Sequence, residues 1–167
     1  YGYVAHQVTG ETLHAFLGNP SARVLDAGCG TGLVGEVLAK LGYGTIDALD
    51  YSQEMLDVAK EKGVYQNYFH ADLSKPLTMG DNAYDAVACA GTFTYGHVDA
   101  GAFDELIRVT KPKGFVCFTI RDGAYQEYGY RDRMIELERA DAWELQEMRD
   151  EDYLRNEGVQ CKLCTYK

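Results

Sequence analysis

Three glycines at alternate positions, directly after a short apolar run, constrain the fold of this chain more than any other feature. The segment VLDAGCGTG spans residues 24–32, and apolar residues then recur at helical spacing over residues 33–41. Glycine adopts positive φ and lets the backbone approach a ligand closely, while a helix N-terminus presents free N–H groups. The sequence therefore predicts a strand, a ligand-cradling loop and a helix, as at the start of a β-α unit.

The same alternation of short apolar runs and helical segments continues along the chain. It predicts a helix over residues 7–17 and then strands at residues 23–27, 45–50, 65–70, 84–90 and 115–120, with helices between them. After these, the pattern predicts an amphipathic helix over 130–140 and two strands, 143–153 and 159–166, joined at Asn156-Glu157-Gly158. We therefore expect one α/β domain over residues 1–167, with a mostly parallel sheet that ends in an antiparallel hairpin.

The charge balance narrows the possible partners. The 167 residues carry 26 acidic and 16 basic side chains, a net charge of −10, with no basic stripe to hold a polyanion. No apolar run is long enough to span a bilayer, so we expect neither a nucleic acid nor a membrane as partner. The five cysteines lack a spaced framework, which predicts reduced thiols in a cytoplasmic protein and no metal site. Because the chain starts at Tyr1, we expect that a natural N-terminal part is missing.

The glycine loop alone leaves two kinds of ligand open. Residues 30–35, GTGLVG, also satisfy the dinucleotide pattern G-x-G-x-x-G, and Asp50 lies 20 residues after Gly30, as in an NAD-type oxidoreductase. Asp26 stands just before the glycines, where its charge would repel a pyrophosphate. The same charge would attract the sulfonium and ammonium groups of S-adenosylmethionine. Asp26 therefore favours the methyl donor.

Residues 24–32 resemble motif I of the class I S-adenosylmethionine-dependent methyltransferases, and the resemblance extends over nearly the whole chain from Arg23. Residues 49–56, LDYSQEML, resemble the second motif of that family, whose acid, here Asp50, holds both ribose hydroxyls. Residues 71–73 resemble the third element, whose acid, here Asp72, accepts a hydrogen bond from the adenine amino group.

Two later segments continue this resemblance. Residues 84–90 resemble the fourth strand of the family, and residues 106–114 resemble the approach to its fifth, with Lys113 where the family usually has a glycine. The sequence Arg108-Val109-Thr110-Lys111-Pro112 and the terminal hairpin make the chain similar to the methyltransferase-like proteins of the Williams-Beuren chromosomal region.

The resemblance implies a Rossmann-like three-layer αβα sandwich, with a seven-stranded sheet in the order 3-2-1-4-5-7-6 that ends in an antiparallel pair. It also implies S-adenosylmethionine as cofactor, S-adenosylhomocysteine as product and a small molecule as methyl acceptor. Cys29 is expected to act through its backbone and not as a nucleophile. The expected cofactor-binding residues are Asp26, Gly28, Cys29, Gly30, Asp50, Tyr51, Ser52, Met55, Asp72, Leu73, Ala90, Gly91 and Thr92.

The acceptor should lie beside the loop after residue 90 and the end of the fifth strand, because ligands bind beyond the carboxyl ends of strands in open α/β sheets. The catalytic candidates there are Tyr95, His97 and Arg121. An imidazole at His97 could take a proton from an oxygen or nitrogen acceptor. In-line methyl transfer depends mainly on alignment and exclusion of water, so a dedicated base is optional. An S-adenosylmethionine-binding module without catalysis stays open as an alternative.

Overall fold

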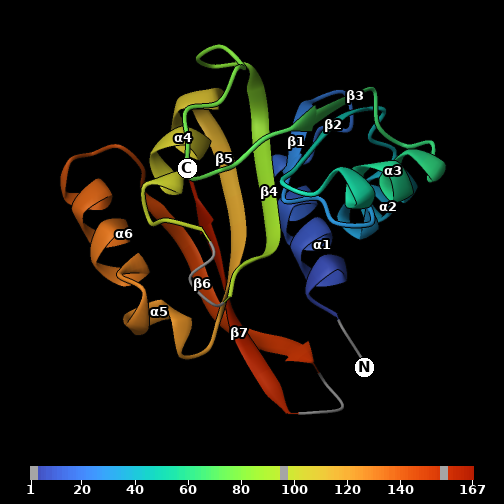
Figure 1. Ribbon diagram of the computed structural model, residues 1–167. Coiled ribbons are helices and arrows are strands. Elements are labelled where there is room, and N and C mark those ends of the chain that lie inside the picture. Colours follow the sequence, from blue (N-terminus) through green and yellow to red (C-terminus); the bar gives the residue numbers. More distant parts are fainter. Residues whose placement is uncertain (1–3, 95–97, 155–157) are drawn as a thin grey trace.

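The computed structural model describes residues 4–94, 98–154 and 158–167. Within these residues, one seven-stranded sheet has the order β3-β2-β1-β4-β5-β7-β6 (Figure 1). Its strands are β1 (Arg23–Ala27), β2 (Thr45–Asp50), β3 (Asn67–His70), β4 (Tyr84–Phe93), β5 (Thr110–Arg121), β6 (Leu145–Leu154) and β7 (Val159–Tyr166). Pairs from β3 to β5 are parallel, and β7 pairs antiparallel with both β5 and β6. The predicted strand order and terminal hairpin are confirmed.

Helices cover both faces of the sheet, with α1 to α3 on one side and α4 to α6 on the other (Figure 1). They are α1 (Ala5–Leu17), α2 (Leu33–Lys40), α3 (Gln53–Glu61), α4 (Ala102–Val109), α5 (Ala124–Glu127) and α6 (Tyr130–Arg139). Successive strand residues point to opposite faces. In β1, Val24 therefore joins one core with Leu38 of α2, and Leu25 joins the other with Leu106 of α4. These two cores give the expected αβα sandwich.

The start of β5 differs from the sequence prediction. The strand begins at Thr110, which pairs with Tyr84 of β4. The next pair in the ladder is Phe115 with Ala86, so β5 has more residues than β4 between the two pairs. The residues between bulge out of the ladder, and Lys113 has a φ of 68°. The residues that precede the predicted strand 115–120 thus form a bulge inside a longer strand, and the left-handed backbone of Lys113 is the conformation that favours the glycine expected there from the family resemblance.

Three smaller differences concern the starts of two strands and one additional helix. β3 begins at Asn67 because Tyr65 turns into the core, and β6 begins at Leu145, after Trp143. The Trp143 ring instead stacks on Tyr166, with ring centroids 3.9 Å apart. The short helix α5 has no counterpart in the sequence prediction.

All five cysteines are free thiols buried in the interior. Among the described residues, none of the helices combines the length and the hydropathy that a membrane-spanning segment requires.

Candidate functional site

A cleft of about 790 Å³ opens where β1, β2 and β4 end and the glycine loop begins. Parallel strands in an open α/β sheet bring their carboxyl ends to one edge, which is where such folds bind ligands. Of the residues expected to bind cofactor, all except Asp26 line this cleft: Gly28, Cys29, Gly30, Asp50, Tyr51, Ser52, Met55, Asp72, Leu73, Ala90, Gly91 and Thr92.

The glycine loop is shaped by close contacts on one side and by open space on the other. A Cβ added at Gly28 would lie 2.1 Å from Oγ1 of Thr92, so a side chain cannot fit between the loop and β4. A Cβ added at Gly30 would meet no atom within 4 Å, and its φ is 54°. The N-cap of α2, Gly32, has no side-chain hydrogen bond to the helix. The loop thus leaves a bare backbone cradle beside an uncapped helix N-terminus.

Gly35, the third glycine of the dinucleotide-like pattern, is required for packing inside the protein. A Cβ at Gly35 would lie 2.3 Å from the hydroxyl oxygen of Tyr65. Tyr65 donates a hydrogen bond from this hydroxyl to Oδ2 of Asp26, with 2.5 Å between the oxygens. Gly35 therefore makes room for the tyrosine that pairs with Asp26.

Asp26 itself does not line the cleft. Its side chain is fully buried, and among the described residues Oδ1 has no hydrogen-bond partner. Burial raises the pKa of Asp26 to about 7, and the charge of Asp50 adds to the rise, whereas the Tyr65 hydroxyl and the Gly35 amide oppose it. The carboxyl group thus lies behind the loop as a titratable group with no direct opening to the cleft.

Asp50 joins β2 to the glycine loop. Its Oδ2 accepts from the Gly30 N–H at 2.8 Å, and its Oδ1 accepts from the Ser52 N–H at 2.9 Å. Each carboxylate oxygen keeps an unused lone pair, because a carboxylate offers about four acceptor sites. Ser52 is the N-cap of α3, with its hydroxyl accepting from the Met55 N–H. Asp50 is therefore oriented by the backbone and still able to accept from a ligand at the cleft.

Asp72 and Leu73 form the opposite wall, just after β3. Oδ1 of Asp72 accepts from the Ser74 N–H at 2.9 Å, which fixes a turn at the rim. Leu73 is buried and belongs to the core beneath the cleft. A polar group thus stands at the rim of this wall and an apolar one below it.

Cys29 lines the cleft without the features of a reactive thiol. Burial, together with the charges of Asp26 and Asp50, raises the pKa of the Cys29 thiol far above its usual range. Its backbone N–H donates to the Leu49 carbonyl at 2.9 Å. This amide thus has a partner within the chain, and the expectation that Cys29 serves the ligand through its backbone stays a prediction.

The acceptor side of the cleft is formed by the end of β4. The Gly91 N–H donates to Oγ1 of Thr119 at 2.9 Å, which connects the C-terminal end of β4 to β5. Arg121 ends β5, is half-buried and is not among the residues that line the cleft. Tyr95 and His97 lie outside the described residues.

Two cleft residues lie outside every motif that sequence reasoning identified. His6, near the start of α1, lines the cleft, and burial lowers the pKa of its imidazole despite the charge of Glu36. Val98, before α4, lines it as well. Neither residue stands in a motif, and only the folding of α1 and α4 against the sheet brings them to the glycine loop. Over the described part of the chain, no group of histidines, cysteines and carboxylates is arranged to hold a metal ion.

The geometry of this cleft agrees with comparisons with known proteins. Residues 25–118 match the family model described as Methyltransferase domain. The chain therefore belongs to the methyltransferase domain family, whose cofactor is S-adenosylmethionine. The expected membership of the class I methyltransferases is confirmed.

Individual relatives support the same family. Methyltransferase-like protein 27 of Homo sapiens is 37% identical over 129 residues, which cover 74% of this chain and 52% of the relative. Malonyl-[acyl-carrier protein] O-methyltransferase of Buchnera aphidicola subsp. Baizongia pistaciae is 39% identical over 113 residues, covering 67% and 45%. The chain thus spans about half the length of the curated relatives it matches.

Among solved structures, magnesium protoporphyrin IX methyltransferase of Synechocystis PCC 6803, with bound S-adenosylmethionine, superposes with a TM-score of 0.72. The two chains are 18% identical, and the match covers 98% of this chain and 79% of that one. At this identity the likeness concerns the fold.

Proposed function

We propose that this chain binds S-adenosylmethionine in the cleft and transfers its methyl group to a small-molecule acceptor. The observation that carries the proposal is the Asp50 carboxylate, which the Gly30 and Ser52 amides orient at the edge of a bare glycine cradle. A carboxylate with unused lone pairs beside such a cradle suits a ligand that has two adjacent hydroxyl groups, such as a ribose.

The residues of the cleft fit the whole cofactor. Asp50 would accept from the ribose hydroxyls, and Asp72 would accept from the adenine amino group. The backbone at Gly30 and the uncapped start of α2 offer space and N–H donors for the amino-acid end. Leu49 and Leu73 supply apolar surface for the flat base. Together these residues would contact the ribose, the base and the amino-acid end of one cofactor molecule.

Asp26 would act through its charge and not by contact, and because its pKa is raised to about 7 it carries this charge fully only above neutral pH. It is buried behind the loop, and a carboxylate there favours a cation over a pyrophosphate in the adjoining cleft. Gly35 makes room for the Tyr65 ring. The third glycine of the dinucleotide-like pattern therefore has a packing role and not a ligand-binding role. Both features favour the methyl donor over a nicotinamide cofactor.

When bound, S-adenosylmethionine supplies a methyl group that its sulfonium already activates for displacement. The chain would therefore bind and orient the two reactants and exclude water, with no enzyme nucleophile. The raised pKa of Cys29 supports this, because a protonated, buried thiol does not compete with the acceptor. Ala90, Gly91 and Thr92 would border the reacting centre. Tyr95 and His97, which lie outside the described residues, and Arg121, which does not line the cleft, stay sequence predictions for contacts to the acceptor.

The acceptor would be a small molecule that approaches past the end of β4. The names of the similar enzymes, which act on a malonyl group and on magnesium protoporphyrin IX, support this class of acceptor. A screen that follows S-adenosylhomocysteine formation across a metabolite library tests turnover. Tight cofactor binding with no turnover on any acceptor would instead favour a binding module without catalysis.

Replacement of Asp50 by alanine tests the cofactor site directly. Loss of charge-assisted hydrogen bonds of about 1.5 to 3 kcal/mol should weaken S-adenosylmethionine binding by roughly tenfold to a hundredfold in calorimetry. Asp57→Ala is the matched control, because Asp57 lies on the exposed side of α3 and accepts only from Gln53 in the described structure. Equal affinity in folded Asp50→Ala and wild-type protein would refute the assignment of Asp50.

A further inference from the structure

The segment from Asp72 to Asn82 connects the cleft to β4 without forming a helix or a strand. Its first two residues, Asp72 and Leu73, line the cleft. A segment without a hydrogen-bonded ladder of its own depends on other elements to fix its path. We call residues 72–82 the rim loop. The contacts that hold the rim loop therefore also set the position of the Asp72 carboxylate.

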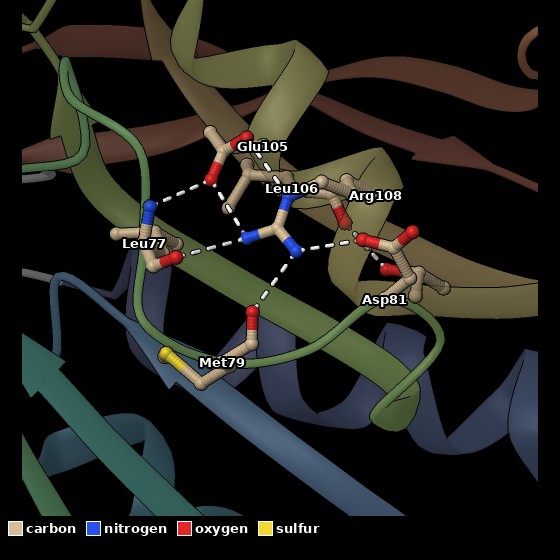
Figure 2. Close-up of polar contacts among 7 residues, drawn as sticks. Leu77, Met79, Asp81, Glu105, Leu106 and Arg108 are labelled. Atoms are coloured by element: carbon tan, nitrogen blue, oxygen red, sulfur yellow. Dashed lines mark hydrogen bonds and ion pairs between the residues drawn. The ribbon is translucent and has the colours of Figure 1, made fainter.

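Helix α4 holds the rim loop through one arginine (Figure 2). Arg108 donates from Nη2 to the Leu77 carbonyl at 3.2 Å and from Nη1 to the Met79 carbonyl at 2.9 Å. Nη1 also donates to Oδ1 of Asp81 at 2.8 Å. Three acceptors spread along the rim loop thus converge on a single guanidinium group.

Glu105, one turn earlier on α4, completes the arrangement (Figure 2). Its Oε2 accepts from the Leu77 N–H at 2.7 Å, and its two oxygens accept from Nε and Nη2 of Arg108 at 2.9 Å each. The hydrogen bond from Arg108 holds the pKa of Glu105 below its usual range, so the carboxylate stays ionised at neutral pH. Both backbone groups of Leu77 are therefore bound by this pair of side chains.

The arrangement requires an arginine and not merely a positive charge. A guanidinium group carries five N–H donors in a fixed planar fork, whereas a lysine ammonium is a compact point donor on a flexible stem. Leu73, Leu77 and Met79 bury their side chains in the core below, so the polar contacts from α4 fix the loop above an apolar base. A further hydrogen bond holds the rim loop from the segment that precedes α4, since the Asp99 N–H donates to the Ser74 hydroxyl at 2.9 Å.

We infer that the Glu105–Arg108 pair is a positioning device. It holds the Asp72 carboxylate where it accepts from the adenine amino group, and it so sets the specificity of the cleft for the base. The inference rests on the proposed function, because Asp72 has this role only if the cleft binds S-adenosylmethionine. It extends that function to two residues on α4 that do not line the cleft.

The test compares two ligands that differ at the adenine amino group. S-adenosylhomocysteine carries this group, whereas S-inosylhomocysteine has a carbonyl oxygen in its place, which a carboxylate at Asp72 disfavours. Wild-type protein should prefer the adenosyl compound by roughly tenfold to a hundredfold, the value of one charge-assisted hydrogen bond. In Arg108→Met, calorimetry should show this ratio falling toward one, because the rim loop no longer holds Asp72 in place.

The ratio separates positioning from a general loss of stability. A smaller folded fraction weakens both ligands equally and leaves the ratio unchanged. Arg133→Met is the matched control, since the ion pairs of Arg133 in the described structure are with Asp104 on α4 and with Glu136, and not with the rim loop. It should keep the wild-type ratio. Arg108→Lys should behave like Arg108→Met, since charge alone does not bridge the three acceptors.

Two further measurements make the outcome decisive. If Arg108→Met does not fold, Arg108→Lys replaces it, and an unchanged ligand ratio in either folded variant overturns the inference. Amide hydrogen exchange without ligand should be faster at Leu77 in the variant than in wild-type protein, and equal exchange also overturns it. Wild-type protein that binds neither compound would refute the proposed function, while the exchange result still decides whether the pair holds the loop.

Discussion

Replacement of Asp26 by asparagine should remove most of the pH dependence of stability in the neutral range. Asp26 is fully buried and bonded to the Tyr65 hydroxyl, and burial raises its pKa from 3.8 to about 7. Asparagine has nearly the same shape and does not titrate. The variant therefore tests the charge state of this one group with little change in packing.

The sign follows from proton binding. Between the unfolded and the folded pKa, folded protein holds a proton on Asp26 that unfolded protein has released, so raising the pH favours unfolding. One pKa unit corresponds to about 1.4 kcal/mol, and the shift therefore removes about 4 kcal/mol of stability as the pH rises from about 4 to about 8. The stabilisation is complete below the unfolded pKa and is lost as the pH passes through the folded one.

Urea unfolding at several pH values measures this effect. Trp143, the single tryptophan, is buried among aromatic rings and reports unfolding by its fluorescence. Asp85 and Glu105, whose pKa values are lowered, act in the opposite direction but are present in both proteins and cancel in the difference. The gap in unfolding free energy between wild type and Asp26→Asn should change steadily from pH 4 to pH 8. Parallel curves for the two proteins would refute a protonated Asp26.

Two glycine substitutions, one in the glycine loop and one in α2, separate ligand binding from packing. Gly30→Val should abolish S-adenosylmethionine binding in calorimetry while the fold survives, because its side chain would enter the open cleft and resist a φ of 54°; normal affinity would mean that the loop does not cradle the cofactor. Gly35→Ala should instead lower the urea midpoint by displacing the Tyr65 ring, at a cost of about 1 to 3 kcal/mol. An unchanged midpoint would contradict the packing role of Gly35.

The strand order was predictable because local and long-range patterns agree. Most of the predicted strands in the parallel part of the sheet are short apolar runs with turn residues at their ends, and the motif resemblance supplied the order that periodicity alone does not. Asp50 and Asp72 were predictable because each closes a strand at the same edge of a parallel sheet. The structure brings both to the cleft, where Asp50 accepts from the Gly30 N–H.

The remaining features depend on contacts between segments far apart in sequence. The separation of Asp26 from the cleft results from Tyr65, which lies 39 residues away and occupies the space beside Gly35. His6 reaches the cleft only because α1 packs against the sheet, and helical spacing says nothing about which end of a helix meets a loop. The proposed role of Arg108 was likewise hidden, since its partners include two backbone carbonyls that no motif encodes.

The place of β7 affects how the protein is made on the ribosome. β7 lies between β5 and β6 although it follows both in the chain, so β6 emerges before the strand with which it pairs. Until then β6 is an unpaired strand, and its alternating charges, Glu147, Arg149 and Glu151 among them, oppose edge-to-edge aggregation. The sheet can close only after residues 159–166 have left the ribosome. Translation that pauses before Val159 would therefore hold the nascent chain with the edges of β5 and β6 both exposed.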